Sequence, residues 1–156
     1  MVKLKALPLD SSLFFKLIRL VNLTARPFHE GVGKAHHLSL NEWRAVVVLA
    51  SHAGCTATDV AEHTGLDKMS VSRALASLEK QGRLKRTADI RDQRRAHLKL
   101  TAAGKKLFAT IGAKATEREA LLFASLAAPE LASMDATLDK LMAAVNALEP
   151  SASEPK

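Results

Sequence analysis

The sequence predicts a mostly α-helical fold with one small β-hairpin near the middle of the chain. Alanine and leucine, two of the best helix formers, dominate the composition. Apolar residues recur at helical spacing along most of the sequence, whereas residues 83–87 and 96–100 alternate between polar and apolar side chains, as half-buried strands do. With 156 residues, of which 47% are hydrophobic, the chain is long enough for one folded core with extensions.

The first predicted helix, residues 13–23, is apolar on nearly every side. A helix of this kind must be buried on several sides, and so small a chain offers little cover, so we expect a second copy to supply part of it. Pro27 is expected to kink or interrupt the helix, and Gly31 and Gly33 to loosen the segment that follows. We assign residues 1–38 to an N-terminal dimerisation region.

Two capping boxes predict the next two helices. Ser39 and Glu42 form the first box, and Thr56 and Asp59 form the second, which opens a shorter helix that ends before Gly65. Gly65 suits the left-handed conformation that terminates many helices. In the helix after the first box we expect four residues to face the core: Trp43, Val46, Val47 and Ala50.

A third short helix is expected to begin after Asp67 and to end at Gln81. Its apolar face consists of Val71, Leu75 and Leu78. The opposite side of its first turns presents polar and basic side chains, namely Lys68, Ser70, Ser72 and Arg73. Two short helices joined by a glycine, the second with such a face, fit a helix-turn-helix, in which the second helix enters the major groove of DNA.

Positive charge is concentrated in one part of the chain. Residues 66–106 hold twelve Lys and Arg against four Asp and Glu, whereas the net charge of the whole chain is +7. The remainder is therefore close to neutral, and such a basic block is typical of a surface that binds a polyanion. The block includes the predicted hairpin tip, residues 89–95, whose arginines can enter a narrow minor groove: Arg91, Arg94 and Arg95.

Each feature also has an ordinary structural interpretation. The third helix fits an amphipathic surface helix with a solvated charged face, and Asp89 and Asp92 can pair with the arginines of the hairpin tip. We expect that some of these pairs brace the tip while at least one arginine reaches outward. Helix and hairpin together favour double-stranded DNA, with Lys68 and Arg73 reaching phosphates or a guanine edge. The short side chain of Ser70, like that of Ser72, lets the helix backbone approach the bases.

Two long helices are predicted after the hairpin, over residues 102–124 and from residue 128 onward. With the first helix, they carry more apolar surface than one small domain can cover, so we expect a symmetric homodimer. In such a dimer, the helix that begins after Asp67 in each copy would enter one of two successive major grooves about 34 Å apart, which predicts a pseudo-palindromic operator. We assign residues 39–101 to a DNA-binding domain, 102–149 to C-terminal dimerisation helices and 150–156 to a disordered tail.

Residues 38–108 carry a resemblance to a known family. They are similar to the winged helix-turn-helix of the MarR family of bacterial transcription regulators, with DKMSVSRALASLEKQG in place of its recognition helix and DIRDQRRAHLKLTAAG in place of its wing. The apolar flanking helices stand where that family has its dimerisation helices. One departure is Arg83, which replaces the usual apolar residue after the glycine.

The resemblance implies a role for several of these residues. Ser70, Ser72 and Arg73 would face the major groove. Arg91 would be the wing-tip arginine in the minor groove, and Asp92 with Arg94 would brace the wing.

The family likeness also implies a small-molecule pocket between the dimer helices and the DNA-reading lobe, often for phenolic or aromatic carboxylate compounds. Candidate lining residues are Arg19, His36, His37, Trp43 and Arg44. An arginine could hold a carboxylate and the tryptophan could stack on a ring. The alternatives are core packing for Trp43 and ion pairs for the two arginines. A bound ligand would favour a lobe spacing that no longer fits the grooves.

Other chemistries find little support in the sequence. It has no Gly-rich phosphate loop, no plausible nucleophile–base pair and no H-E-x-x-H motif, so we expect neither an enzyme nor a cofactor. The lone Cys55 excludes an intrachain disulfide and is expected to be structural. The six histidines contain no i, i+4 pair on a helix, so no metal site is expected. With no secretory signal and no long apolar run, we expect a cytoplasmic protein.

Two functions remain open from the sequence. The first is a ligand-responsive dimeric repressor of transcription. The second is an effector-independent architectural or constitutive DNA-binding protein, whose outer helices serve assembly alone. Release from the operator by a small compound would separate the two.

Overall fold

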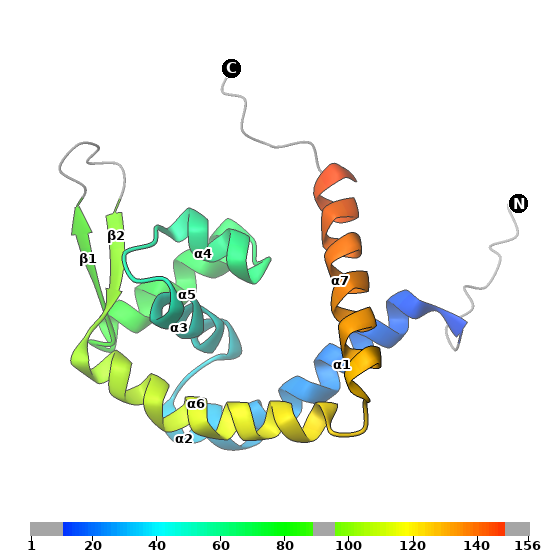
Figure 1. The fold of residues 1–156 in the computed structure, drawn as a ribbon. Coiled ribbons are helices and arrows are strands. Elements are labelled where there is room, and N and C mark those ends of the chain that lie inside the picture. The colour runs from blue at the N-terminus through cyan, green and yellow to red at the C-terminus, as the bar shows by residue number, and fades with distance from the viewer. Residues whose placement is uncertain (1–10, 89–95, 149–156) are drawn as a thin grey trace, which may run out of the picture. The chain divides into compact units, whose positions relative to one another are not determined.

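The computed structural model describes residues 11–88 and 96–148 of the chain, and it is mostly helical with one β-hairpin (Figure 1). The predicted fold class is confirmed at this level. The elements in chain order are α1 (Leu13–Pro27), a π-helix η2 (Phe28–Val32), α2 (Gly33–His36), α3 (Leu40–Ser51), α4 (Ala57–Thr64), α5 (Lys68–Lys80), β1 (Leu84–Ala88), β2 (Ala96–Leu100), α6 (Ala102–Phe123) and α7 (Ala128–Leu148).

The chain divides within α6 into two compact units, residues 1–111 and residues 112–156. In the described part of the chain, no single helix is long and apolar enough to cross a membrane. The helices α6 and α7 meet the criteria of length and composition only when they are taken together as a bent pair.

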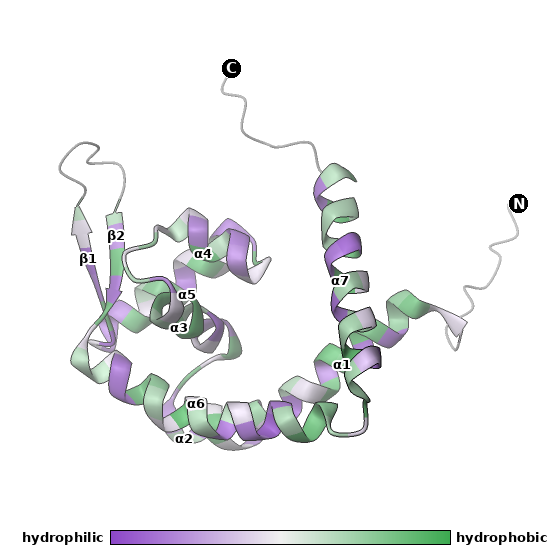
Figure 2. Ribbon diagram, viewed as in Figure 1, coloured by the Kyte–Doolittle hydropathy of each residue, from purple (hydrophilic) through white to green (hydrophobic). Residues whose placement is uncertain are grey.

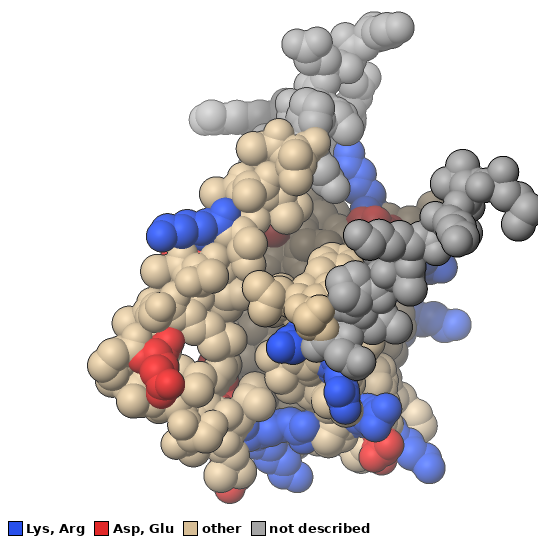
Figure 3. Space-filling model, turned by 90° about the vertical axis from the view of Figure 1, so that its right-hand side faces the viewer, with Lys and Arg blue, Asp and Glu red and all other residues tan. Residues whose placement is uncertain are grey.

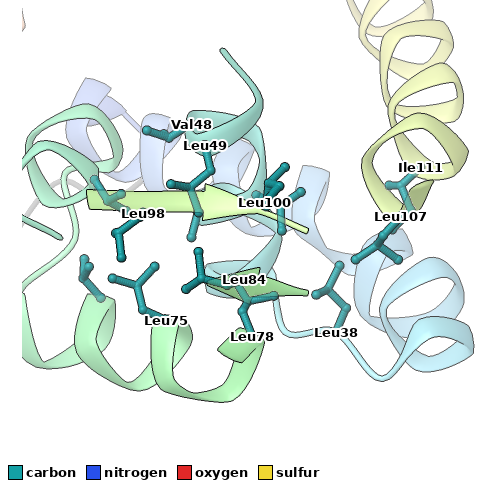
Figure 4. Close-up of a cluster of buried hydrophobic side chains, with 14 residues drawn as sticks. Leu38, Val48, Leu49, Leu75, Leu78, Leu84, Leu98, Leu100, Leu107 and Ile111 are labelled. Carbon is teal, nitrogen blue, oxygen red and sulfur yellow. The ribbon is translucent and has the colours of Figure 1, made fainter. Parts of the chain in front are cut away.

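The core of the first unit is built around the hairpin. The strands pair antiparallel with Leu84 opposite Leu100. The leucines of the strands lie between Leu75 and Leu78 of α5 and the side chains of α3, and α6 adds its first turns at one end (Figure 4). The predicted alternation is confirmed in β2, where Leu98 and Leu100 are buried and Lys99 is exposed. It is wrong for β1, where Leu84 is buried but residues 85–88 are all exposed.

The helix starts follow the predicted caps. The hydroxyl oxygens of Ser39 and Thr56 accept hydrogen bonds from the backbone N–H groups of Glu42 and Asp59, whose carboxylates accept from the backbone N–H groups of the two caps in return. Both capping boxes are therefore confirmed. Gly65 ends α4 with a φ of +66°, in the left-handed region where glycine has no steric penalty.

The prediction for the core face of α3 is wrong in part. Val46 is fully buried, but Trp43 and Val47 are only partly buried and Ala50 is exposed. The buried face is centred instead on Ala45, Val46, Val48 and Leu49. The reason is that α3 packs against α4, α5 and β2 at once, so its buried face is rotated from the stripe that the sequence suggested.

The segment after Pro27 remains helical, contrary to the expectation that its glycines loosen it. The α-helix ends at Pro27, where an interruption was predicted, and the chain continues as a π-helix whose wider turn is closed by the Gly33 N–H donating to the Phe28 carbonyl. Gly33 is buried, and a Cβ there would lie 2.8 Å from the Leu38 carbonyl oxygen. Glycine is thus required by close packing, rather than by a flexible loop.

Gly104 joins α6 to the hairpin in a similar way. A Cβ on this residue would overlap the carbonyl oxygen of Arg83, which accepts a hydrogen bond from the Thr101 N–H at 3.1 Å. We therefore expect Gly104→Ala to destabilise the fold by about 1–3 kcal/mol, the usual effect of overpacking. Urea denaturation monitored by circular dichroism measures this. The matched control is Gly31→Ala, since a Cβ there meets nothing within 4 Å. Equal stability of the two variants would contradict the steric argument.

Candidate nucleic-acid interface

The start of α5 is fixed by Asp67. One carboxylate oxygen accepts a hydrogen bond from the Ser70 N–H at 2.8 Å, and the other accepts from the Ser70 hydroxyl at 2.6 Å. The Ser70 hydroxyl, followed by its backbone N–H, lowers the pKa of Asp67 below its ordinary value. The carboxylate is therefore charged throughout the physiological range, at a helix terminus that stabilises negative charge.

The polar face predicted for α5 is the one that the fold leaves accessible. Lys68, Ser72 and Arg73 are exposed, whereas Ser70 is partly buried and its hydroxyl proton is committed to Asp67. The helix is anchored from below by four buried side chains, Val71, Ala74, Leu75 and Leu78. All three apolar residues predicted for this face are confirmed as buried. This anchoring presents the first turns of α5 as a rigid outward surface.

Arg73 borders a hollow between α5 and the start of α3. The hollow has a volume of about 300 Å³ and is lined by Ser39, Asn41, Glu42, Ser70, Arg73, Ala74 and Ser77. Glu42, at 5% exposure, is the buried charged side chain of this region; its carboxylate accepts from the Ser39 N–H and from the Gln81 side-chain amide. The hollow therefore combines hydroxyl groups with one exposed arginine.

The hairpin is held to the rest of the unit on both sides. Arg86 of β1 forms an ion pair with Glu79 of α5 at 2.9 Å. On the other side, the Gly54 N–H donates to the Leu98 carbonyl at 3.1 Å, and the Leu98 N–H donates to the Cys55 carbonyl at 2.9 Å. The connection between α3 and α4 is thus hydrogen-bonded through its backbone to β2. Five residues predicted for the wing lie outside the described residues: Asp89, Arg91, Asp92, Arg94 and Arg95.

The structure assigns Arg83 a position that the sequence pattern did not indicate. Its Nη2 donates to the carbonyl oxygen of His36, at the end of α2, at 2.6 Å. Its Nη1 is buried and has no hydrogen-bond partner among the described residues. The arginine therefore ties the base of the hairpin to the connection before α3. The departure from an apolar residue was visible in the sequence, but its partner, 47 positions away, was not.

The five residues predicted to contact a ligand have varied surroundings. Trp43 is stacked between Phe28 and Phe108, with ring centroids 6.5 and 6.0 Å away, which agrees with its alternative role in packing. Arg44 donates to the Asn41 side chain at 3.4 Å. Arg19 is exposed on α1, and His37 ends α2 with a φ of +48°. Their contact with a ligand stays a prediction.

Cys55 is partly buried, and burial, followed by the charge of Asp59, raises the pKa of its thiol. A thiol of this kind forms less thiolate at neutral pH than a free cysteine, which fits the structural role expected from the sequence. Among the residues that the structure describes, no group of three or more His, Cys, Asp or Glu is placed to hold a metal ion.

Comparisons with known proteins agree on one family. A model of the MarR family matches residues 36–95. Among curated proteins, the chain is 36% identical over 77 residues to the HTH-type transcriptional regulator FarR of Neisseria gonorrhoeae, covering 49% of this chain and 53% of FarR. It is 29% identical over 84 residues to the homoprotocatechuate degradative operon repressor of Escherichia coli, covering 54% and 57%. The chain thus matches little more than half the length of these relatives.

The resemblance extends further in space than in sequence. A crystal structure of a MarR/EmrR family transcriptional regulator from Acinetobacter sp. ADP1 superimposes with a TM-score of 0.82 and 25% identity, over 90% of this chain and 99% of that one. The similarity therefore includes the flanking helices as well as the helix-turn-helix and the hairpin. These relatives are named as transcription regulators, the class of protein expected from the sequence. The fold is a winged helix-turn-helix, and residues 36–95, which contain it, match the MarR family.

Proposed function

We propose that this chain is a homodimeric, sequence-specific DNA-binding repressor of transcription that a small aromatic ligand releases from its operator. The observation that carries DNA binding is the outward face of α5, where Lys68, Ser72 and Arg73 are exposed on a helix anchored by four buried side chains. To recognise a DNA sequence, a helix must be held rigidly while its first turns contact the edges of the bases. Repression is supported by the relative from Escherichia coli, which is named as an operon repressor.

The proposed DNA contacts divide into two kinds. Ser70, Ser72 and Arg73 face the bases in the major groove, where arginine pairs well with guanine, and Lys68 binds phosphate. Since the Ser70 hydroxyl proton is bound by Asp67, Ser70 offers a base only its acceptor lone pairs. The hairpin tip supplies the second kind of contact, in the minor groove, through Arg91, Arg94 and Arg95, with Asp89 and Asp92 as its braces.

The proposed dimer rests on apolar side chains that each unit leaves exposed. Neither α1 nor α7 contains a buried residue. Hydrophobic residues nevertheless recur along both helices (Figure 2), and charged side chains cover only the smaller part of the described surface on the face drawn in Figure 3. In α7, for example, Met142 is 58% exposed and Val145 is 54% exposed. Exposed apolar surface on this scale marks a protein interface, which a second copy would cover.

The proposed ligand response uses the five residues named in the sequence analysis: Arg19, His36, His37, Trp43 and Arg44. Arg19 would pair with a carboxylate, and the stack that contains Trp43 would accept an aromatic ring. An aromatic ligand is supported by the relative from Escherichia coli, which is named as the repressor of the homoprotocatechuate degradative operon. For release, the ligand must bind more tightly to the conformation whose lobe spacing does not fit the DNA grooves than to the conformation whose spacing does.

The role of Arg73 can be tested by substitution. We expect Arg73→Ala to weaken binding to the cognate operator by about 1–3 kcal/mol, or roughly 5-fold to 150-fold, because a base contact is lost. Fluorescence anisotropy with labelled duplex measures the affinity. The control is Lys80→Ala, which removes the same charge from the other end of α5 and should change affinity by less than about twofold. Equal losses in the two variants would place α5 outside the groove.

Arg91 is predicted to meet the minor groove. Replacing it with Ala should weaken binding and reduce the slope of log K against log salt by about 1 per protomer, since fewer counterions are released. Affinities at four or more salt concentrations give this slope. Lys114→Ala, on α6 outside the basic block, should leave the slope unchanged. An Arg91→Ala variant with the wild-type slope would refute the minor-groove contact.

The dimer interface can be tested on α7. Val145→Asp places a charge in the proposed interface and should shift the sedimenting species from dimer to monomer. Ala143→Asp introduces the same charge about 160° away around the helix, at 100° per residue, and should remain dimeric. Analytical ultracentrifugation distinguishes the two forms, and circular dichroism checks that both variants are folded. A folded, dimeric Val145→Asp variant would exclude α7 from the interface.

A further inference from the structure

A second cavity lies at the base of the hairpin, away from the exposed face of α5. Its volume is about 410 Å³, within the range of sites for small molecules. It is formed by the end of α3 and the turn after it, the two strands and the first turns of α6. All these elements, labelled in Figure 1, belong to the first unit. The lining residues are Leu49, Ala50, Ala53, Lys85, Lys99, Leu100, Lys105 and Phe108.

Three lysines from three elements surround this cavity. Lys85 of β1 and Lys99 of β2 are direct partners in the strand register, and Lys105 comes from the first turns of α6. Like charges directly opposite on a sheet destabilise it. No acidic side chain lines the cavity, and within the described ranges, 11–88 and 96–148, none of the three lysines has an ion pair. The site therefore has uncompensated positive charge that an anion would neutralise.

The rest of the lining is apolar. Leu49 and Leu100, which belong to the core shown in Figure 4, contribute buried side chains to it. Ala50 of α3 and Ala53 of the turn after it add methyl groups. Phe108 closes the wall with an aromatic ring, whose other neighbour is Trp43. A bare inorganic anion would leave this apolar surface in contact with water. The combination instead fits a molecule with one negatively charged end and an apolar body.

We propose that this cavity binds a small organic carboxylate with an apolar body. The carboxylate oxygens accept hydrogen bonds from the lysine ammonium groups, and the body packs against Leu49, Leu100 and Phe108. The site shares no residue with the five proposed for the effector, nor with those proposed for DNA. It therefore adds a binding site to the proposed function, and only its effect on operator affinity rests on that function.

The position of the site gives occupancy a physical consequence. Lys85 and Lys99 belong to the two strands of the hairpin, while Lys105 belongs to α6. A carboxylate held by all three restrains the hairpin against α6 and removes the repulsion between the strands. We expect a bound carboxylate to raise the melting temperature and to change operator affinity through the hairpin.

Trp43 provides a direct readout. It is the single tryptophan of the chain, and its stacking partner Phe108 lines the cavity. The probes are octanoate and cyclohexanecarboxylate, which do not absorb where tryptophan is excited. The uncharged controls are octanamide and cyclohexanecarboxamide. With the full-length protein and no DNA, we expect the carboxylates to change the Trp43 emission saturably and to raise the melting temperature, and the amides to bind at least about 5-fold more weakly.

Substitutions locate the site. Lys105→Gln is expected to weaken carboxylate binding by about 2-fold to 5-fold, and Lys99→Gln with Lys105→Gln by about 10-fold. Lys106→Gln is the matched control, since Lys106 is exposed on the neighbouring position of α6 but does not line the cavity. It removes the same charge and should bind the probes as the wild type does.

The outcomes separate this proposal from the proposed function. Loss of binding in Lys105→Gln, but not in Lys106→Gln, supports the site, whether or not the protein binds an operator. Equal affinity of all variants places the carboxylate elsewhere and overturns the proposal, as does the absence of saturable binding at millimolar probe. A ligand-free Lys105→Gln variant that loses operator affinity, while Lys106→Gln keeps it, would make Lys105 a phosphate contact and would also overturn the proposal.

Discussion

The packing of the hairpin leucines between α3 and α5 is the interaction on which the rest of the first unit depends. Leu75, Leu78 and Leu98 are fully buried, and Leu84 is almost so. These side chains position α5 from one side and the hairpin from the other, so the two surfaces proposed to meet DNA share one foundation. A substitution that creates a cavity among these leucines would therefore displace both surfaces at once, and would affect the proposed DNA binding without changing any residue proposed to contact DNA.

Local chemistry made much of this fold predictable. Capping boxes predicted the starts of α3 and α4, alternation predicted the buried face of β2, and the spacing of Val71, Leu75 and Leu78 predicted the buried face of α5. Each signal lies within a few residues of the feature that it predicts. The buried face of α3 was less predictable, because contacts with three other elements, α4, α5 and β2, decide which of its sides is covered. For the same reason, the sequence could not reveal that the Leu38 carbonyl oxygen leaves no room for a Cβ at Gly33.

The sites show the same division between local and distant information. The polar face of α5 was readable because it lies on one helix. The lysine-lined cavity was not, since its lining comes from α3, both strands and α6, and no spacing along the chain links Lys85, Lys99 and Lys105. Likewise, Arg83 could be recognised as unusual, but its bond to the His36 carbonyl depends on how the connection before α3 folds back toward the hairpin.

The cap of α5 has a consequence for selectivity. A helix terminus that points at DNA ordinarily offers bare N–H groups to any phosphate, whatever the sequence. Here the carboxylate of Asp67 already accepts from the Ser70 N–H, and its charge repels a phosphate that approaches this terminus. In the proposed complex, this charge would reduce affinity for arbitrary duplexes at a point that carries no sequence information, while the proposed contacts to base edges would be unaffected. The ratio of specific to non-specific affinity would then rise, and that ratio decides how many of a genome's competing sites a regulator ignores.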